Sequence, residues 1–137
     1  MKIHHIGIIV KNIENSLKLY SKLGFKRITD IVEDKIQHNI IVFLSFKNES
    51  PIIELIQPLD EQSSVINSRV GYHHICFEAE PKEDIVSEFR SIGIGKIFAG
   101  PIVAPAINNR EVAFACLNNC TFIELILKGE CNENNIS

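Results

Sequence analysis

Two histidines and two glutamates recur in this chain at nearly the same spacing. His5 lies in an apolar segment near the start, and Glu54 follows it by 49 residues. His74 lies in a similar segment, and Glu124 follows it by 50 residues. Imidazole nitrogens and carboxylate oxygens are ligands for borderline divalent metal ions. The repeated spacing predicts an internal duplication in which each copy gives one imidazole and one carboxylate to a shared metal site.

The two glutamates stand at the centres of short apolar segments, Ile52-Ile53-Glu54-Leu55-Ile56 and Phe122-Ile123-Glu124-Leu125-Ile126. Turn residues bound both segments, which is typical of buried strands. A carboxylate in such a strand is costly to bury unless something compensates its charge. Taken singly, such a glutamate would more often face water, and a histidine in an apolar strand would more often be a core residue. The duplicated register favours the shared metal site.

Each histidine belongs to a His-His pair at the start of a predicted strand. Adjacent strand residues point to opposite faces, so only one histidine of each pair can face the site. The apolar pattern that follows aligns Ile6 with Ile75. This alignment selects His5 and His74 over the histidine that precedes each of them.

The hydrophobic pattern predicts the order strand-helix-strand-strand-strand twice, and therefore an α+β fold. Asn12 is placed to cap the first helix and Gly24 to end it, while Pro81 suits the first position of the second helix and Gly93 its end. The expected strands span residues 2–10, 25–32, 37–46, 51–56, 71–79, 96–98, 111–117 and 121–128, with a loop over 100–109.

A chain of 137 residues is long enough for one compact domain with its own core. We expect a single domain over 1–128, made of repeat one (1–58), a linker (59–70) and repeat two (71–128). Residues 129–137 are polar and are expected to form a frayed tail.

Composition excludes several classes of function. The formal net charge is −3, whereas nucleic-acid and anionic-membrane binders depend on basic surface. No apolar run approaches the ~20 residues of a membrane span, and the start of the chain lacks the pattern of a signal peptide. The chain has four cysteines, Cys76, Cys116, Cys120 and Cys131, and none of them forms a C-x-x-C pair. We interpret them as reduced thiols and therefore expect a cytoplasmic protein.

Paired modules with a histidine on each first strand and a glutamate on each last strand resemble the vicinal oxygen chelate superfamily, which includes glyoxalase I and methylmalonyl-CoA epimerase. The resemblance covers residues 2–128. It implies a curved mixed sheet, formed by two tandem β-α-β-β-β modules around a central metal site. It also implies that His5, Glu54, His74 and Glu124 hold one divalent ion, which would be Zn, Ni, Co or Mn.

Three segments resemble the epimerases in amino-acid sequence: His4-His5-Ile6-Gly7-Ile8-Ile9-Val10, Glu54-Leu55-Ile56-Gln57-Pro58-Leu59 and His73-His74-Ile75-Cys76-Phe77-Glu78. Bacterial glyoxalase I carries an arginine on the first strand and an asparagine after the fourth, where this chain has Ile9 and Pro58. The epimerases also carry a further catalytic glutamate near strand three. Candidates for that role here are Glu33, Asp34 and Gln37, and the sequence leaves the choice open.

The resemblance implies a metal-dependent isomerase that removes a proton next to a carbonyl, with Glu124 and Glu54 as catalytic carboxylates. We expect an acyl-CoA epimerase. The alternatives are glyoxalase I, also called lactoylglutathione lyase, which acts on a hemithioacetal, and a non-catalytic protein that binds a small molecule in the same fold. We also expect a homodimer, because exposed sheet edges are usually covered. The sequence leaves open whether one chain or two complete the site.

Overall fold

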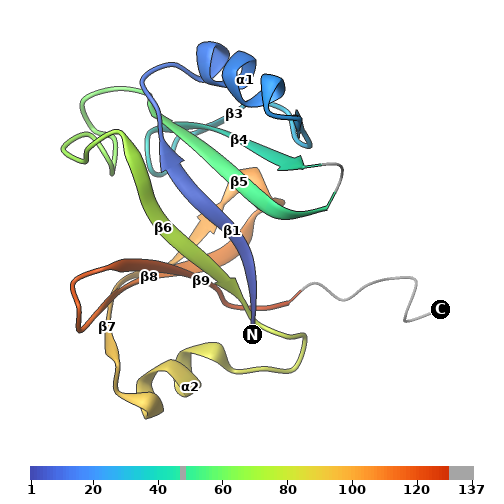
Figure 1. Ribbon diagram of the computed structural model, residues 1–137. Coiled ribbons are helices and arrows are strands. Elements are labelled where there is room, and N and C mark those ends of the chain that lie inside the picture. Colours follow the sequence, from blue (N-terminus) through green and yellow to red (C-terminus); the bar gives the residue numbers. More distant parts are fainter. Residues whose placement is uncertain (47–48, 130–137) are drawn as a thin grey trace. The chain divides into compact units, whose positions relative to one another are not determined.

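The structure is a computed structural model that describes residues 1–46 and 49–129. These residues form nine strands, two α-helices and one 3-10 helix (Figure 1). In chain order the elements are β1 (Lys2–Ile9), α1 (Ile13–Lys22), β2 (Phe25–Arg27), β3 (Val32–Asp34), β4 (Asn39–Phe46), β5 (Glu49–Pro58), β6 (Gly71–Glu78), α2 (Ile85–Ile92), β7 (Gly95–Ala104), η1 (Pro105–Ile107), β8 (Arg110–Leu117) and β9 (Phe122–Ile126). Parallel and antiparallel pairs both occur, so the predicted α+β fold with a mixed sheet is confirmed.

The chain divides into two compact units, which we describe separately. Unit 1 consists of Met1–His4, Ile75–Val103 and the described residues from Arg110 on. Unit 2 consists of His5–His74 and Ala104–Asn109. These units are defined by compactness and not by repetition in the sequence. The predicted boundaries of the two repeats therefore remain a prediction. The predicted frayed tail falls almost wholly on residues 130–137, which lie outside the described residues.

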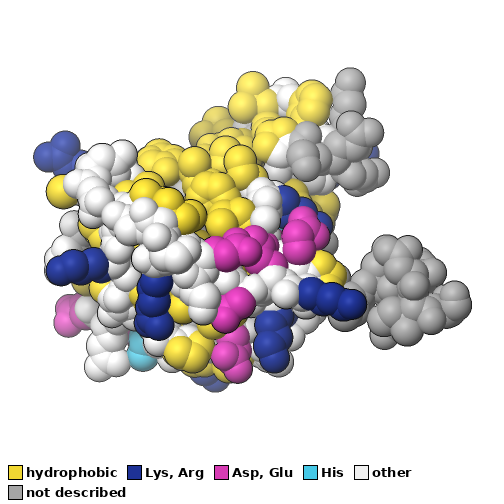
Figure 2. Space-filling model, turned by 90° about the horizontal axis from the view of Figure 1, so that it is seen from below, with side chains coloured by type: hydrophobic (Ala, Val, Ile, Leu, Met, Phe, Trp, Pro, Cys, Tyr) yellow, Lys and Arg dark blue, Asp and Glu magenta, His cyan; other side chains and the backbone are white. Residues whose placement is uncertain are grey.

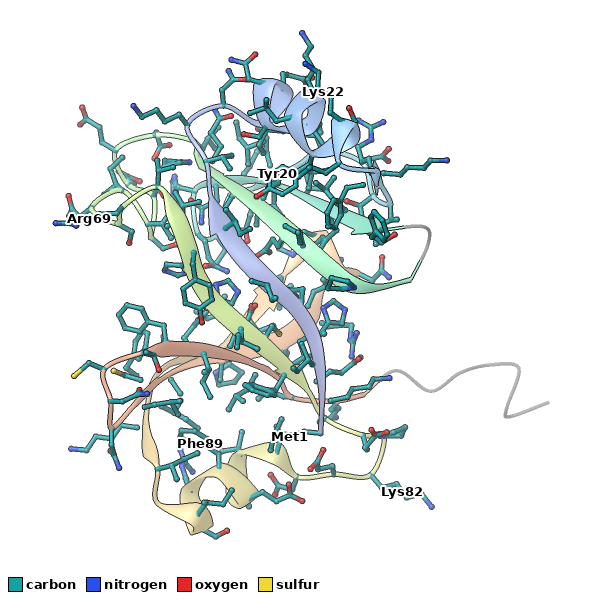
Figure 3. All side chains as sticks on the ribbon, viewed as in Figure 1. Met1, Tyr20, Lys22, Arg69, Lys82 and Phe89 are labelled. Atoms are coloured by element: carbon teal, nitrogen blue, oxygen red, sulfur yellow. The ribbon has the colours of Figure 1, made fainter. Side chains whose placement is uncertain are left out.

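Helix α1 covers one face of the strands of unit 2. Asn12 caps the helix, because its side-chain oxygen accepts a hydrogen bond from the backbone N–H of Asn15. Tyr20 lies on the strand-facing side of α1 and Lys22 on its outer side (Figure 3). The core beneath the helix is apolar and consists of Val10, Ile13, Val42, Leu44, Ile53 and Leu55.

The other face of these strands is set by their register. Strands β4 and β5 run antiparallel with Phe43 opposite Glu54, and β1 runs parallel to β5 with Gly7 opposite Glu54. Paired residues point to the same face of a sheet, and residues two apart on a strand share that face. The face away from α1, which we call the site face of unit 2, therefore carries His5, Gly7, Phe43, Ser45 and Glu54.

Unit 1 is built on the antiparallel pair of β8 and β9, with α2 packed against it. Asp84 caps α2 by accepting a hydrogen bond from the N–H of Ser87, and Gly93 ends it in the left-handed conformation, as predicted. Phe89 points from α2 into the core (Figure 3). Figure 2 is viewed from the side of α2 in Figure 1 and shows several acidic side chains close together.

The predicted strand over 25–32 is wrong in extent, because the structure has two short strands there. Strands β2 and β3 both pair with β4, but residues 28–31 lie outside either strand. The N–H of Phe43 donates to the side-chain oxygen of Thr29 instead of to a backbone carbonyl. This side-chain bond replaces a ladder bond and interrupts the strand.

Two predictions in the second half of the chain are also wrong. Helix α2 begins at Ile85, because the Asp84 cap fixes its start, and Pro81 lies in the preceding turn. Strand β7 runs over ten residues, so the predicted short strand over 96–98 and the first part of the predicted loop over 100–109 are one strand. Because β7 stands at the end of the strand order, Pro101 can be accommodated without its N–H.

Candidate metal centre

Three of the four predicted ligands converge within unit 2. The Nε2 atoms of His5 and His74 lie 3.2 Å apart. Glu54 Oε1 lies 3.4 Å from His5 Nε2 and 3.5 Å from His74 Nε2. All three side chains are buried, with residue exposures of 1%, 3% and 7% for His5, His74 and Glu54. One donor atom of each residue therefore points at a common position.

The space for this cluster is made by Gly7. A Cβ atom added at Gly7 would lie 2.2 Å from Cε1 of His74, much closer than real Cβ contacts allow. Gly7 and His5 lie two residues apart on β1 and share the site face. The missing side chain at position 7 therefore lets the imidazole of His74 lie against β1.

Two aromatic neighbours hold the imidazoles in place. The ring of Phe43 meets the ring of His5 edge-on, with the ring centres 5.0 Å apart. His73 Nδ1 lies 2.8 Å from His74 Nδ1, which is hydrogen-bond distance. A neutral His74 with its proton on Nδ1 can donate to His73 and present the lone pair of Nε2 to the cluster. This is the tautomer that a metal ligand needs.

The three donors fit a divalent ion of the zinc type. Two donor atoms that each lie about 2.1 Å from one ion are about 3.0–3.4 Å apart at bond angles of roughly 90–110°. The observed separations of 3.2, 3.4 and 3.5 Å agree well with these values. Two imidazole nitrogens and one carboxylate oxygen also suit Zn, Ni, Co or Mn. A cation at this position would compensate the buried charge of Glu54.

The fourth predicted ligand belongs to unit 1. Glu124 lies at the centre of β9, opposite Phe114 of β8, and is 5% exposed. Its strand neighbours Ile123 and Leu125 belong to the core beneath α2, so the Glu124 side chain lies on the opposite face of the strand. The structure thus brings His5, Glu54 and His74 together and places Glu124 in the other unit.

Two of the three candidates for a further acid or base near the third predicted strand, Glu33 and Asp34, do not join this cluster. Glu33 is exposed. Asp34 is buried, but it pairs with Asn39, four residues before Phe43 on β4, which is about 13 Å along the strand. Its Oδ1 atom accepts hydrogen bonds from the N–H groups of Ile36 and Gln37, which shapes the turn there. Oδ1 of Asp34 therefore has a structural role, while Oδ2 is buried without a hydrogen-bond partner among the described residues.

Sequence reasoning missed three residues of the site face: Gly7, Phe43 and Ser45. Alternation along a strand places them on one of two faces, but it does not say which face carries the chemistry. The pairing of Phe43 and Gly7 with Glu54 decides this. The sequence signal was the single carboxylate of Glu54, which marks the polar face only once the register is known.

The comparison with protein families identifies the fold. Residues 4–114 match the family model described as the Glyoxalase/Bleomycin resistance protein/Dioxygenase superfamily. This chain belongs to that superfamily. It is the vicinal oxygen chelate superfamily, whose members commonly bind a divalent metal ion, and the cluster in unit 2 is a possible site for such an ion.

One curated relative within the superfamily is the mitochondrial methylmalonyl-CoA epimerase of Dictyostelium discoideum. It is 28% identical over 85 residues, which are 58% of this chain and 49% of that protein. The chain spans about half the length of this relative.

Several solved structures are similar to this chain in fold. A hypothetical protein from Bacillus halodurans C-125 has a TM-score of 0.79 and 28% identity, over 97% of this chain and 98% of that one. Methylmalonyl-CoA epimerase from Mycobacterium tuberculosis has a TM-score of 0.79 and 19% identity, over 99% and 92%. A Streptomyces coelicolor methylmalonyl-CoA epimerase variant, in complex with 2-nitronate-propionyl-CoA, has a TM-score of 0.76 and 19% identity, over 95% and 99%.

Within the described residues, neither α-helix is long and apolar enough to cross a membrane.

Proposed function

We propose that this protein is a metal-dependent isomerase that removes and returns a proton next to the carbonyl of an acyl-CoA, as methylmalonyl-CoA epimerase does. The convergence of two imidazoles and one carboxylate in unit 2 is the observation that carries the proposal. The similarity to epimerases in sequence and fold supports the choice of substrate. The Streptomyces enzyme was solved with an acyl-CoA derivative bound, which supports the same choice.

The proposed ligand set is His5, Glu54, His74 and Glu124. The support for Glu124 comes from the repeat, since it stands in the second half where Glu54 stands in the first. Glu124 is also 5% exposed, in a strand whose neighbouring residues belong to the core. Bound divalent metal supplies a Lewis acid that stabilises negative charge on a carbonyl oxygen.

The carboxylates of this chain perform the proton transfer in this proposal. Glu124 takes the proton from the carbon next to the carbonyl, and Glu54 is the second catalytic carboxylate. The Nε2 atoms of His5 and His74 would hold the ion, since neutral imidazole nitrogens are common metal ligands. Burial of the three residues in unit 2 limits the access of bulk water to their donor atoms.

The test is proton exchange in D₂O, followed by mass spectrometry, with a panel of substrates and the metal-loaded full chain. We expect deuterium at the 2-position of methylmalonyl-CoA, and loss of this exchange after chelation and in a His74→Ala variant. Exchange or turnover only with the hemithioacetal of glutathione would establish glyoxalase I in its place. Exchange with no member of the panel would favour a binding protein and contradict the proposal.

One observation disfavours glyoxalase I. The position at which bacterial glyoxalase I carries an arginine for glutathione is occupied here by Ile9, which is 2% exposed. Ile9 packs against Ile56 and Val65, so an apolar cluster stands where a cation would be needed. The homodimer and the cytoplasmic location remain predictions.

A further inference from the structure

The hydroxyl group of Ser45 is buried without a hydrogen-bond partner among the described residues. Ser45 is 3% exposed. An unpaired buried hydroxyl costs free energy, because it loses its bonds to water and gains none in return. Such a group in a folded protein calls for an explanation, and a ligand that supplies the partner is one.

Ser45 lies on the site face of unit 2, next to the metal cluster. It follows Phe43 by two residues on β4, which is about 7 Å along the strand, and Phe43 is paired with Glu54. The intervening residue, Leu44, points the other way into the core beneath α1. The hydroxyl therefore stands on the face that carries His5 and Glu54.

A local irregularity accompanies Ser45. The register of β4 and β5 shifts between Ser45 and Phe46, so that Ser45 is opposite Ile52 while Phe46 is opposite Glu49. Such bulges re-aim side chains and are frequent beside active sites. Pro51, which has no N–H to give to the ladder, lies in the extra segment on β5.

A second buried serine of unit 2 shows what a structural hydroxyl looks like. Ser63 is 5% exposed; its hydroxyl donates to the Asn39 side chain and accepts a hydrogen bond from the N–H of Val65. Its bonding is thus complete within the protein, whereas Ser45 finds no such partner in the described part of the chain. The two serines form a matched pair of similar burial with opposite bonding.

We propose that the Ser45 hydroxyl donates a hydrogen bond to the free carboxylate of a 2-carboxyacyl thioester bound at this face. This inference rests on the proposed function and names a residue that selects its substrate class. A carboxylate that leaves water needs donors, and a hydroxyl bond to an ionised oxygen is stronger than one to a neutral oxygen. Thioesters without the carboxylate do not engage Ser45.

The experiment compares Ser45→Ala with Ser63→Ala in the full chain loaded with zinc. Calorimetric titration measures the affinity for methylmalonyl-CoA and for propionyl-CoA, which lacks the 2-carboxylate. We expect Ser45→Ala to lower the affinity for methylmalonyl-CoA about 10- to 100-fold and to leave the affinity for propionyl-CoA unchanged. Without ligand, the melting temperature should stay or rise in Ser45→Ala and fall in Ser63→Ala, because only Ser63 loses bonds to other described residues.

The outcomes separate this inference from the proposed function. Tight binding of methylmalonyl-CoA by both wild type and Ser45→Ala would overturn the role of Ser45 alone. Equal weakening of both thioesters would overturn the assignment to the carboxylate. A fall in melting temperature like that of Ser63→Ala would show a structural hydroxyl and overturn the inference. Failure of the wild type to bind either thioester would overturn the proposed function together with the ligand named here.

Discussion

The imidazole of His74 occupies the space in which a side chain at Gly7 would stand. A Cβ atom at Gly7 would lie 2.2 Å from Cε1, 2.5 Å from Nδ1 and 2.9 Å from Nε2 of the His74 ring. Glycine in a strand usually weakens it, since it packs nothing and loses more entropy on folding. Position 7 accepts this disadvantage because the approach of His74 requires it.

Replacement of Gly7 by alanine should therefore damage the metal cluster. The new methyl group would displace the His74 ring from its position 3.2 Å from His5 Nε2. We expect the affinity for Co²⁺, followed by its visible absorption, to fall at least tenfold and the melting temperature to fall as well. In a His74→Ala background the same change at Gly7 should be tolerated, because the ring is gone. Equal damage in both backgrounds would contradict the steric explanation.

Removal of a metal-binding imidazole should release the metal. We expect purified protein to hold about one divalent ion per chain, and His74→Ala to lose most of it, because Nε2 of His74 is one of the three converging donors. Elemental analysis of the purified variants measures this. His38→Ala is the control, since His38 pairs with Asp60 outside the cluster. Full metal content in a His5/His74 double variant would disprove the assignment.

The two carboxylates should differ in what their loss does. If Glu124 is the base, Glu124→Gln should keep most of the metal while proton exchange falls by about 10²–10⁴-fold. Substrate binding should change much less, since the lost interaction belongs mainly to the transition state. Glu54→Gln should be milder in an epimerase, where the resemblance implies that glutamine is tolerated, and severe in a glyoxalase. Unchanged exchange in Glu124→Gln would remove Glu124 as the base.

A partly buried ion pair in unit 1, Glu78 with Arg110, should make stability depend on pH. Burial raises the pKa of Glu78, but the hydrogen bond and charge of Arg110, with smaller contributions from His4 and Lys2, bring the pKa below its ordinary value of 4.5. Glu78 therefore stabilises the fold above about that pH, and this contribution is lost as the pH falls through its lowered pKa. Urea unfolding between pH 7 and pH 3 should show the decline.

The same pair predicts the effect of a substitution. Arg110 also donates to the carbonyl of Lys128, so Arg110→Gln removes two contacts and leaves the Glu78 charge buried. We expect the free energy of unfolding at pH 7 to fall by about 2 kcal/mol. This is less than for an isolated buried pair, because Lys2 lies 3.7 Å from Glu78 and still compensates part of its charge. The loss should shrink as the pH falls through the pKa of Glu78, because a protonated side chain leaves no unpaired charge. A double Glu78→Gln/Arg110→Gln variant should recover part of it, and an unchanged loss at every pH would contradict this account.

The expected homodimer is tested by mass. Strands β2 and β7 stand at the two ends of the strand order and have a partner on one side only in that order. Proteins usually cover such edges. Light scattering at micromolar concentration should give twice the mass of 15.5 kDa. A mass of one chain would contradict the expectation.

Much of the fold could be predicted because local patterns and the tertiary structure agree. The strands around Glu54 and Glu124 and the caps at Asn12 and Gly93 depend on short apolar runs and on residues with one strong local preference. The start of α2 could not be predicted, because Pro81 and Asp84 are both suitable initiators and only the hydrogen bond from Ser87 selects one. The length of β7 could not be predicted either, because strand pairing overrode the loop preference of its prolines.

For the candidate site, the sequence by itself determined which residue types recur and at what spacing. That was enough to propose His5, Glu54, His74 and Glu124, because the same spacing of histidine and glutamate recurs in both halves of the chain. Only the tertiary structure decided that the three donor atoms converge, that Gly7 makes the space for His74, and that Ser45 shares their face without a partner among the described residues. The physical reason is that convergence, steric fit and hydrogen-bond satisfaction depend on strand register and packing between residues far apart in the chain.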